Sequence, residues 1–132
     1  MSLRVEAHSR LTISNDNSAS PTDIVYGPGD KSFVDSSTYN EGTSKVLQLP
    51  PSTVNQAVNL DAIVSVAALQ VLAEGTQVSV TLVPTGKTLG DCSALKLLPG
   101  FPLVIGSDIA AIYLSNADTL NAAKVHVGAA GN

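Results

Sequence analysis

The stretch Val66–Val71, VAALQV, decides the fold, because it recurs almost residue for residue as IAAIYL in Ile109–Leu114. After a polar turn, each copy is followed by a second alternating segment, QVSVT at 77–81 and KVHVG at 124–128. The C-terminal part of the chain therefore contains two copies of one predicted β unit. A doubled hairpin unit buries its apolar faces against its own copy, which favours a sandwich of two sheets. Leucine-rich runs that end in proline precede the two copies, at 46–50 and 95–99.

Short apolar or alternating segments follow one another through the rest of this region, with Pro and Gly turns between them. This spacing of short strands and turn signals is typical of an all-β protein. The run 64–72 is also compatible with a helix, because Ala, Leu and Gln favour helices. Its copy is rich in Ile and Tyr and favours a strand, and the two copies should share one conformation. We predict strands at 45–49, 54–60, 64–72, 77–83, 93–98, 101–105, 109–115 and 122–128.

The N-terminal part of the chain has a different character. Residues 3–13 alternate between apolar and polar side chains, which predicts a strand covered on one side. From Ser14 the alternation is lost in a tract rich in turn-forming residues, where only 24–26 and 32–34 look like short strand fragments. Loops this long are uncommon in a compact domain and are usually functional or disordered. We therefore predict one all-β domain, 1–132: a two-sheet antiparallel β-sandwich, jelly-roll-like, with an irregular polar arm or loop at 15–43 and duplicated hairpin units at 44–130.

The predicted arm contains Tyr26, Phe33 and Tyr39, three of the five aromatic residues in the chain. Disordered segments are poor in aromatic residues, so we expect an ordered arm that packs on something. Packing on its own sandwich and packing on a neighbouring protein are equally compatible with the sequence. If a neighbour is contacted, these three residues are the predicted protein–protein contact residues.

The composition points to association with other proteins. Charged residues make up 14% of the chain, where about 25% is usual. Charged residues are depleted at the centres of protein interfaces, although many small β proteins are simply rich in Ser and Thr. The net charge of −4 argues against a nucleic-acid partner, which would need a basic stripe. We find neither a secretory signal nor an apolar run of about 20 residues, and we therefore predict synthesis in a cytoplasm and no membrane partner.

Few residues suggest catalysis or metal binding. His8 and His126 could share a metal on two strands, but a metal site needs three or four converging ligands. Ser107 and Asp108 could join His126 in a Ser-His-Asp site, but the G-x-S-x-G elbow is absent. Cys92 has no second thiol with which to form a disulfide or a metal site. We predict no catalytic, cofactor-binding or metal residue, no cofactor, and no enzymatic activity.

Two patterns in the arm have a simpler interpretation as turns. Residues 27–32, GPGDKS, end in Lys-Ser like a phosphate-binding loop, but they lack its spacing, and the proline removes a backbone donor. Four aspartates could bind calcium with loop carbonyls, but their spacing matches no calcium loop. Sugar binding would require the arm tyrosines to form an aromatic platform. The four aspartates are Asp16, Asp23, Asp30 and Asp35.

The order of motifs from Ser44 to Gly128 resembles a known class of proteins. It begins with SKVLQLP and continues through VNL at 58–60 and ALQV at 68–71 to VSVTL at 78–82. It then passes through LKL and IAAIYLSN to a closing AKVHV. This pattern resembles small virion proteins of tailed bacteriophages, namely capsid cement or decoration proteins and minor tail proteins with a jelly-roll-like β-sandwich. The resemblance contains no catalytic motif, and it does not extend to the N-terminal arm.

This resemblance implies a structural role. Such a protein binds on or between subunits of the major capsid protein, often as a homotrimer, and stabilises the phage head. It is made in the host cytoplasm and then becomes part of the virion. The alternative is a tail-associated or carbohydrate- or receptor-binding β-sandwich module, and a small hydrolase is a third possibility. The sequence leaves open whether the location is the shell or the tail, the number of subunits, and the contact surface.

Overall fold

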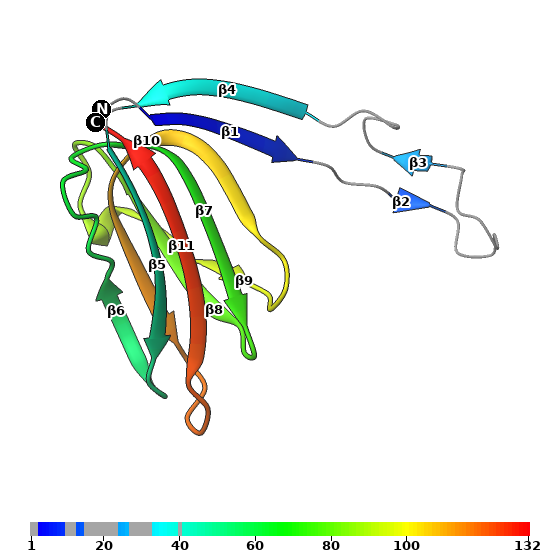
Figure 1. Ribbon diagram of the computed structural model, residues 1–132. Coiled ribbons are helices and arrows are strands. Elements are labelled where there is room, and N and C mark those ends of the chain that lie inside the picture. Colours follow the sequence, from blue (N-terminus) through cyan, green and yellow to red (C-terminus); the bar gives the residue numbers. More distant parts are fainter. Residues whose placement is uncertain (1–2, 10–12, 15–23, 27–32, 40) are drawn as a thin grey trace. The chain divides into compact units, whose positions relative to one another are not determined.

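The computed structural model describes residues 3–9, 13–14, 24–26, 33–39 and 41–132, with side chains from Glu41 onward except that of Ser107. The contacts divide the chain into two units, Glu6–Ser37 and the remainder, Met1–Val5 with Thr38–Asn132. The described residues contain eleven strands and one short 3-10 helix (Figure 1). These elements are β1 (Leu3–Ser9), β2 (Ile13–Ser14), β3 (Ile24–Tyr26), β4 (Phe33–Tyr39), β5 (Glu41–Leu49), β6 (Thr53–Ala57), β7 (Val66–Glu74), β8 (Val78–Pro84), η1 (Leu89–Asp91), β9 (Leu95–Leu97), β10 (Leu103–Asn116) and β11 (Ala123–Gly131).

Strands β5 to β11 form one seven-stranded sheet in the order β5-β11-β7-β10-β8-β9, with β6 added alongside β10. The strand β10 joins the two halves of this sheet, because its residues 103–109 pair with β7 and its residues 109–115 pair with β8. In Figure 1, β10 curves from beside β7 toward β6 and β8. All of these pairs are antiparallel, which confirms the all-β prediction. The hydrogen bonds join the strands into a single continuous sheet, so a division into two jelly-roll sheets stays a prediction.

The curved sheet encloses a single aliphatic core to which both of its halves contribute. Fully burying an aliphatic side chain of this size contributes about 1.5–3 kcal/mol. The copy at 66–71 lies in β7, so the strand prediction was correct and the helical alternative was wrong. The segments predicted at 101–105 and 109–115 are one continuous strand, β10. The largest fully buried aliphatic side chains are Leu49, Val66, Val71, Val78, Val80, Ile109, Ile112, Leu114, Val125 and Val127.

A β-bulge lets both halves of β10 point their aliphatic side chains into the same core. Ile109 is buried, and so are Ile112 and Leu114, so the alternation changes phase between them. The pairing with β8 shifts at the same place, between Ile109 and Ala111. The extra residue, Ala110, bends the strand and moves every later side chain to the opposite face. The strand β7 has the equivalent irregularity between Val66 and Ala68.

The strand order of the sheet is symmetric under exchange of the two sequence repeats. Exchanging the repeats turns β5 into β9, β7 into β10 and β8 into β11, and this exchange reproduces the strand order of the sheet. Val66 and Ile109, which begin the two copies, pair directly with each other. The predicted hairpins need correction, because β7 pairs with β10 and β11 whereas β8 pairs with β10 and β9. The backbone partners of the strands in one repeat come from the other repeat.

The N-terminal region contains more strand than the predicted irregular arm. Here β1 pairs with β4 in a two-stranded sheet, and β2 pairs with β3 in another. The second pair is antiparallel, with Ile13 opposite Tyr26. The fragment predicted at 32–34 is the beginning of β4, and sequence alternation missed the rest of this strand because its residues are mostly polar. We call the unit Glu6–Ser37 the ribbon unit.

Candidate functional site

The outer face of β5, β11 and β7 carries the most distinct group of side chains in the described part of the chain. Strand pairing arranges these side chains in rows across the sheet. His126 lies between Val46 and Leu72, and Gly128 lies in the next row between Ser44 and Gln70. Neighbours in such a row are close enough to interact directly.

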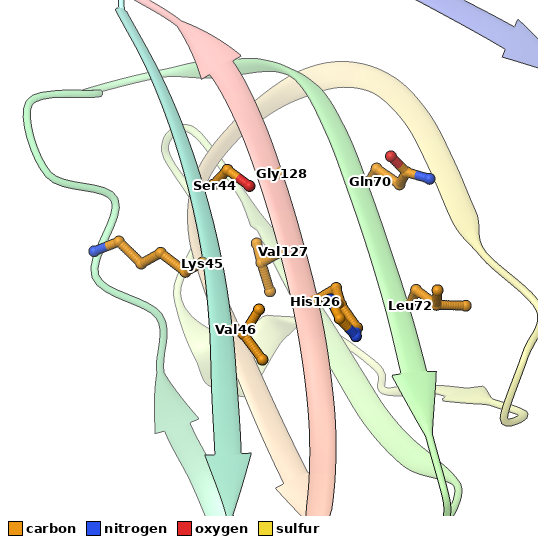
Figure 2. Close-up of a pocket in the computed structure, with 8 residues that line it drawn as sticks. All are labelled: Ser44, Lys45, Val46, Gln70, Leu72, His126, Val127 and Gly128. Atoms are coloured by element: carbon orange, nitrogen blue, oxygen red, sulfur yellow. The ribbon is translucent and has the colours of Figure 1, made fainter.

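A shallow depression of about 200 Å³ occupies this face (Figure 2). It forms beside Gly128, which has no side chain to fill the space between its neighbours Ser44 and Gln70. A methyl group added at Gly128 would meet no atom within 4 Å, so the space above it is open. The depression offers a hydroxyl and an amide for hydrogen bonding. Its lining residues are Ser44, Lys45, Val46, Gln70, Leu72, His126, Val127 and Gly128.

A carboxylate with two basic neighbours lies at the edge of the depression. His126 Nε2 is 3.3 Å from Glu74 Oε1, and Lys124 Nζ is 3.6 Å from Glu74 Oε2. The contact with the His126 imidazole is the largest cause that lowers the pKa of Glu74, and the Lys124 charge lowers it further. Nε2 itself is buried and makes no well-formed hydrogen bond. The His126–Glu74 contact is therefore a close approach of the two side chains rather than a well-aligned hydrogen bond.

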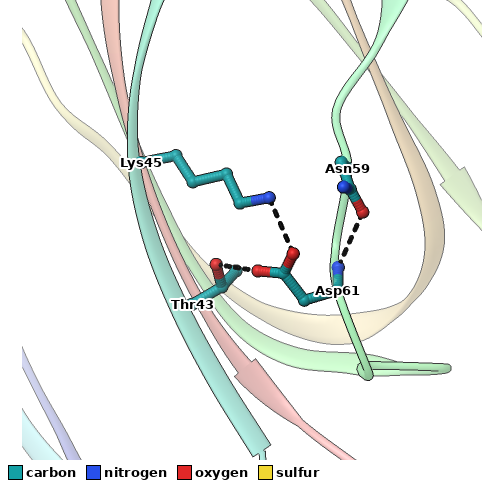
Figure 3. Close-up of polar contacts among 4 residues, drawn as sticks. All are labelled: Thr43, Lys45, Asn59 and Asp61. Atoms are coloured by element: carbon teal, nitrogen blue, oxygen red, sulfur yellow. Dashed lines mark hydrogen bonds and ion pairs between the residues drawn. The ribbon is translucent and has the colours of Figure 1, made fainter.

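A second polar cluster fastens the loop after β6 to the edge strand β5 (Figure 3). Thr43 Oγ1 donates to Asp61 Oδ2 at 2.6 Å, and Lys45 Nζ donates to Asp61 Oδ1 at 2.9 Å. The backbone N–H of Asp61 donates to Asn59 Oδ1 at 2.9 Å. The Thr43 hydrogen bond is the largest cause that lowers the pKa of Asp61, followed by the Lys45 hydrogen bond. Thr43 and Lys45 alternate with the outward residues of β5, so they lie on the core side of the sheet at its edge.

The three residues considered for a Ser-His-Asp site do not form one. Asp108 accepts hydrogen bonds from the hydroxyls of Ser65 and Thr85, which lower its pKa. Ser65 precedes β7, whereas His126 pairs with Leu72 near the far end of β7. At about 3.3 Å per residue, this places the two groups roughly 23 Å apart along the strand. The Ser107 side chain lies outside the described residues.

Other candidate residues stay untested or have local structural roles. The backbones of Tyr26, Phe33 and Tyr39 lie in β3 and β4, but their side chains are outside the described part, so their contact role stays a prediction. Cys92 is half-buried, and its thiol donates to the Thr88 carbonyl at 3.4 Å. No group of three or more His, Cys, Asp or Glu side chains converges among the residues searched, which are the described ones. The side chains of His8 and Asp35, the segment 27–32 and residues Asp16 and Asp23 lie outside the description.

The sequence interpretation missed a buried asparagine at the end of β10. Asn116 Nδ2 donates to the carbonyls of Leu49, Pro50 and Asn121 at 3.2, 3.3 and 2.9 Å. Its Oδ1 accepts the backbone N–H of Asp118 at 3.0 Å. The side chain therefore ties together the two turns at this end of the sheet. The only signal in the sequence is a polar residue that ends an apolar run before a turn.

Comparison with known proteins places the chain in no family. No protein-family description and no curated protein matches its sequence. One solved structure, from a study of the mechanism of oxalate oxidase, matches with a TM-score of 0.46 and 13% identity. The match covers 67% of this chain and 42% of that one, so this chain spans less than half the length of that protein. Within the described residues, no helix has the length and apolar character to cross a membrane.

Proposed function

We propose that this protein is a structural virion protein that binds on or between major capsid subunits and stabilises the phage head. The class of protein comes from the resemblance of residues 44–128 to cement and decoration proteins. The structural observation that supports it is the ribbon unit, a separate cluster of contacts whose described strands belong to two-stranded sheets. In this proposal the ribbon unit contacts the neighbouring subunits, and the seven-stranded sheet carries it.

The physical basis is the weakness of two-stranded sheets. An isolated two-stranded sheet is at best marginally stable in water, because it has no opposing layer against which to bury a face. A unit built in this way gains stability when a partner surface covers it. Strands β1 to β4 also offer backbone groups along their outer edges, to which a neighbouring chain can add hydrogen bonds.

The outer face of β5, β11 and β7 is compatible with a role at an interface. Around the depression it presents the uncharged residues Ser44, Val46, Gln70 and Gly128, and the lining also includes Lys45 and His126. Interface centres are depleted in charged residues, so the uncharged rows of this face are suited to a contact with another protein. The charged group at Glu74 lies at one end of the face.

The test is removal of residues 1–40, which leaves the strands β5 to β11 intact. The shortened chain should keep a cooperative thermal unfolding transition. It should lose co-sedimentation with shells assembled from the major capsid protein of the same genome. A shortened chain that still binds the shells like the full chain would exclude the ribbon unit as the contact element. Binding to isolated tails instead of shells would favour the tail-associated alternative.

A finer variant tests the three predicted contact residues, of which Tyr26 and Phe33 lie in the ribbon unit and Tyr39 lies just after it. Replacing Tyr26, Phe33 and Tyr39 together by alanine should weaken shell binding by at least tenfold, because aromatic residues commonly carry much of the binding energy of an interface. The matched control replaces the exposed Val54 by alanine in the seven-stranded sheet and should leave shell binding unchanged. Unchanged binding by the triple variant would contradict the assignment of these three residues.

A further inference from the structure

The edges of the seven-stranded sheet differ in how well they are protected. A strand with a neighbour on one side only presents unpaired backbone N–H and C=O groups to any other strand that approaches. Strands β5, β6 and β9 each have one partner among the described strands, and the first half of β10 pairs only with β7. Proteins usually block such edges with charges, irregular backbone or short strands.

Three of these edges are blocked. Lys45 lies on the core side of β5 and is held there by Asp61, an inward-pointing charge of the kind that discourages strand pairing. The strand β6 is interrupted by Asn55, which has a positive φ of 49° and donates its N–H to Ser115 Oγ. The strand β9 has only three residues, and its middle residue is Lys96.

The edge formed by residues 103–107 of β10 has none of these protections. Its pairing with β8 begins only where Ile109 meets Pro84. The segment Leu103–Ser107 reads LVIGS and carries no charge. Three of the eight large hydrophobic side chains that are exposed in the described residues lie on this edge or in the segment that leads into it, with Phe101 68% exposed. These three residues are Leu98, Phe101 and Val104.

We propose that this edge is the binding site for a second copy of the chain, which pairs through its own residues 103–107. An antiparallel pair of identical strands is self-complementary about a twofold axis, so one edge can serve both copies. Because the segment is uncharged, the two copies approach without like-charge repulsion. The pairing joins two β5-β11-β7-β10 arrays into one continuous sheet and covers exposed apolar side chains beside the edge.

The experiment measures the mass of the full-length protein over a range of concentrations by sedimentation velocity. The test variant is Val104→Lys, and the matched control is Val46→Lys. Both valines are exposed, at 40% and 56%, on the outer face of the same array but on its two opposite edge strands. The wild type and Val46→Lys should form dimers with the same dissociation constant. Val104→Lys should weaken the dimer by at least tenfold, because it brings two lysines close to the axis, while its thermal unfolding stays that of the wild type.

Three outcomes with the full-length proteins would overturn the inference: a wild type that stays monomeric, a Val46→Lys variant weakened as much as Val104→Lys, or a trimer that Val104→Lys leaves intact. The last would agree with the trimer implied by the resemblance. The shortened chain 41–132 separates this inference from the proposed function. It should dimerise like the full chain even though it no longer binds shells, whereas loss of the dimer on shortening would place self-association in the ribbon unit.

Discussion

The two repeats share a sequence pattern but differ in the six residues that precede the shared core strand. In the second repeat, residues 103–108 extend β10, and residues 103–107 form the open edge of the sheet. In the first repeat, residues 60–65 form a loop that Asp61 fastens to β5. Aligning the copies on Val66 and Ile109 places Asp61 opposite Val104. At this position the first repeat has the carboxylate of Asp61, which helps to protect the edge strand β5. The second repeat has the exposed Val104, which lies on the unprotected edge of β10.

This difference shows that a repeat fixes its central strands more firmly than its flanks. Both flanking segments are mostly apolar, LDAIVS and LVIGSD, and both could form strand. Their surroundings decide the outcome. In the first repeat, Lys45 of β5 provides an ion-pair partner for the carboxylate. In the second, Val104 pairs with Gln70 of β7, and the segment continues the ladder.

The largest effect should follow from deleting the bulge residue Ala110. Without it, the two halves of β10 share one alternation, so one half must point its aliphatic side chains away from the core. We expect the cooperative thermal transition to disappear, as measured by calorimetry. Deleting Lys87 from the exposed turn after β8 is the control and should keep the transition. If the variant without Ala110 unfolds like the wild type, the bulge does not determine which side chains of β10 face the core.

The next effect concerns the close approach between the C-terminal strand and the loop of the first repeat. A methyl group at Gly131 would lie 1.9 Å from the Ser65 carbonyl oxygen. Gly131→Ala should therefore destabilise the fold by about 1–3 kcal/mol through forced displacement of backbone. Gly128→Ala, on the same strand with open space above it, should stay within about 0.5 kcal/mol of the wild type. Equal values for the two variants in urea unfolding would contradict this assignment.

A similar loss should follow from removing the buried amide that distinguishes the second repeat from the first. Aligned on Val66 and Ile109, Asn116 corresponds to Ala73, and both residues are fully buried. Asn116→Ala leaves carbonyls without their donor, which costs about 1–3 kcal/mol. Asn121→Ala loses one exposed hydrogen bond to Asp118 and should cost less. Urea unfolding of both variants checks the order, which would be reversed if the Asn116 amide were dispensable.

The smallest effect is the pH dependence of stability that comes from Asp61, which holds the loop of the first repeat against the edge strand β5. Because the pKa of Asp61 is lowered in the folded state, its contribution to stability is present above the ordinary value near 3.8. It is lost as the pH falls through the lowered value. Asp61→Asn should therefore reduce the melting temperature slightly at pH 7, and the difference from the wild type should narrow toward pH 3. A constant difference across this range would show that the charge of Asp61 is not involved.

The sequence predicted the parts of this fold whose signal is local. The duplicated copies at Val66 and Ile109 and the alternation in β8 gave the right secondary structure. The order of apolar and polar residues within one segment is enough to show which side chains of a strand face the core. The pairing of strands was not predictable in the same way. A short turn such as 75–77 can close a hairpin or an arch between two layers, and only the packing of both repeats decides between them.

The candidate sites could not be predicted from the sequence for the same reason, because they depend on which strands pair. The Lys45–Asp61 pair joins residues far apart in the chain, and neither lies in a motif. His126 was identified as a candidate, but its partner Glu74 depends on the register between β11 and β7. The protection of β5 and the openness of β10 follow from the strand order, which the alternation of single segments does not contain.

The pairing of Val66 with Ile109 also has a consequence for how such a chain can arise. The strands of each repeat pair with strands of the other repeat. Half of the chain on its own therefore lacks the backbone partners needed to complete a sheet. A protein with a single copy of the unit would have to assemble as two identical molecules, joined where these two residues now meet. Covalent linkage of the halves turns that assembly into a one-chain fold.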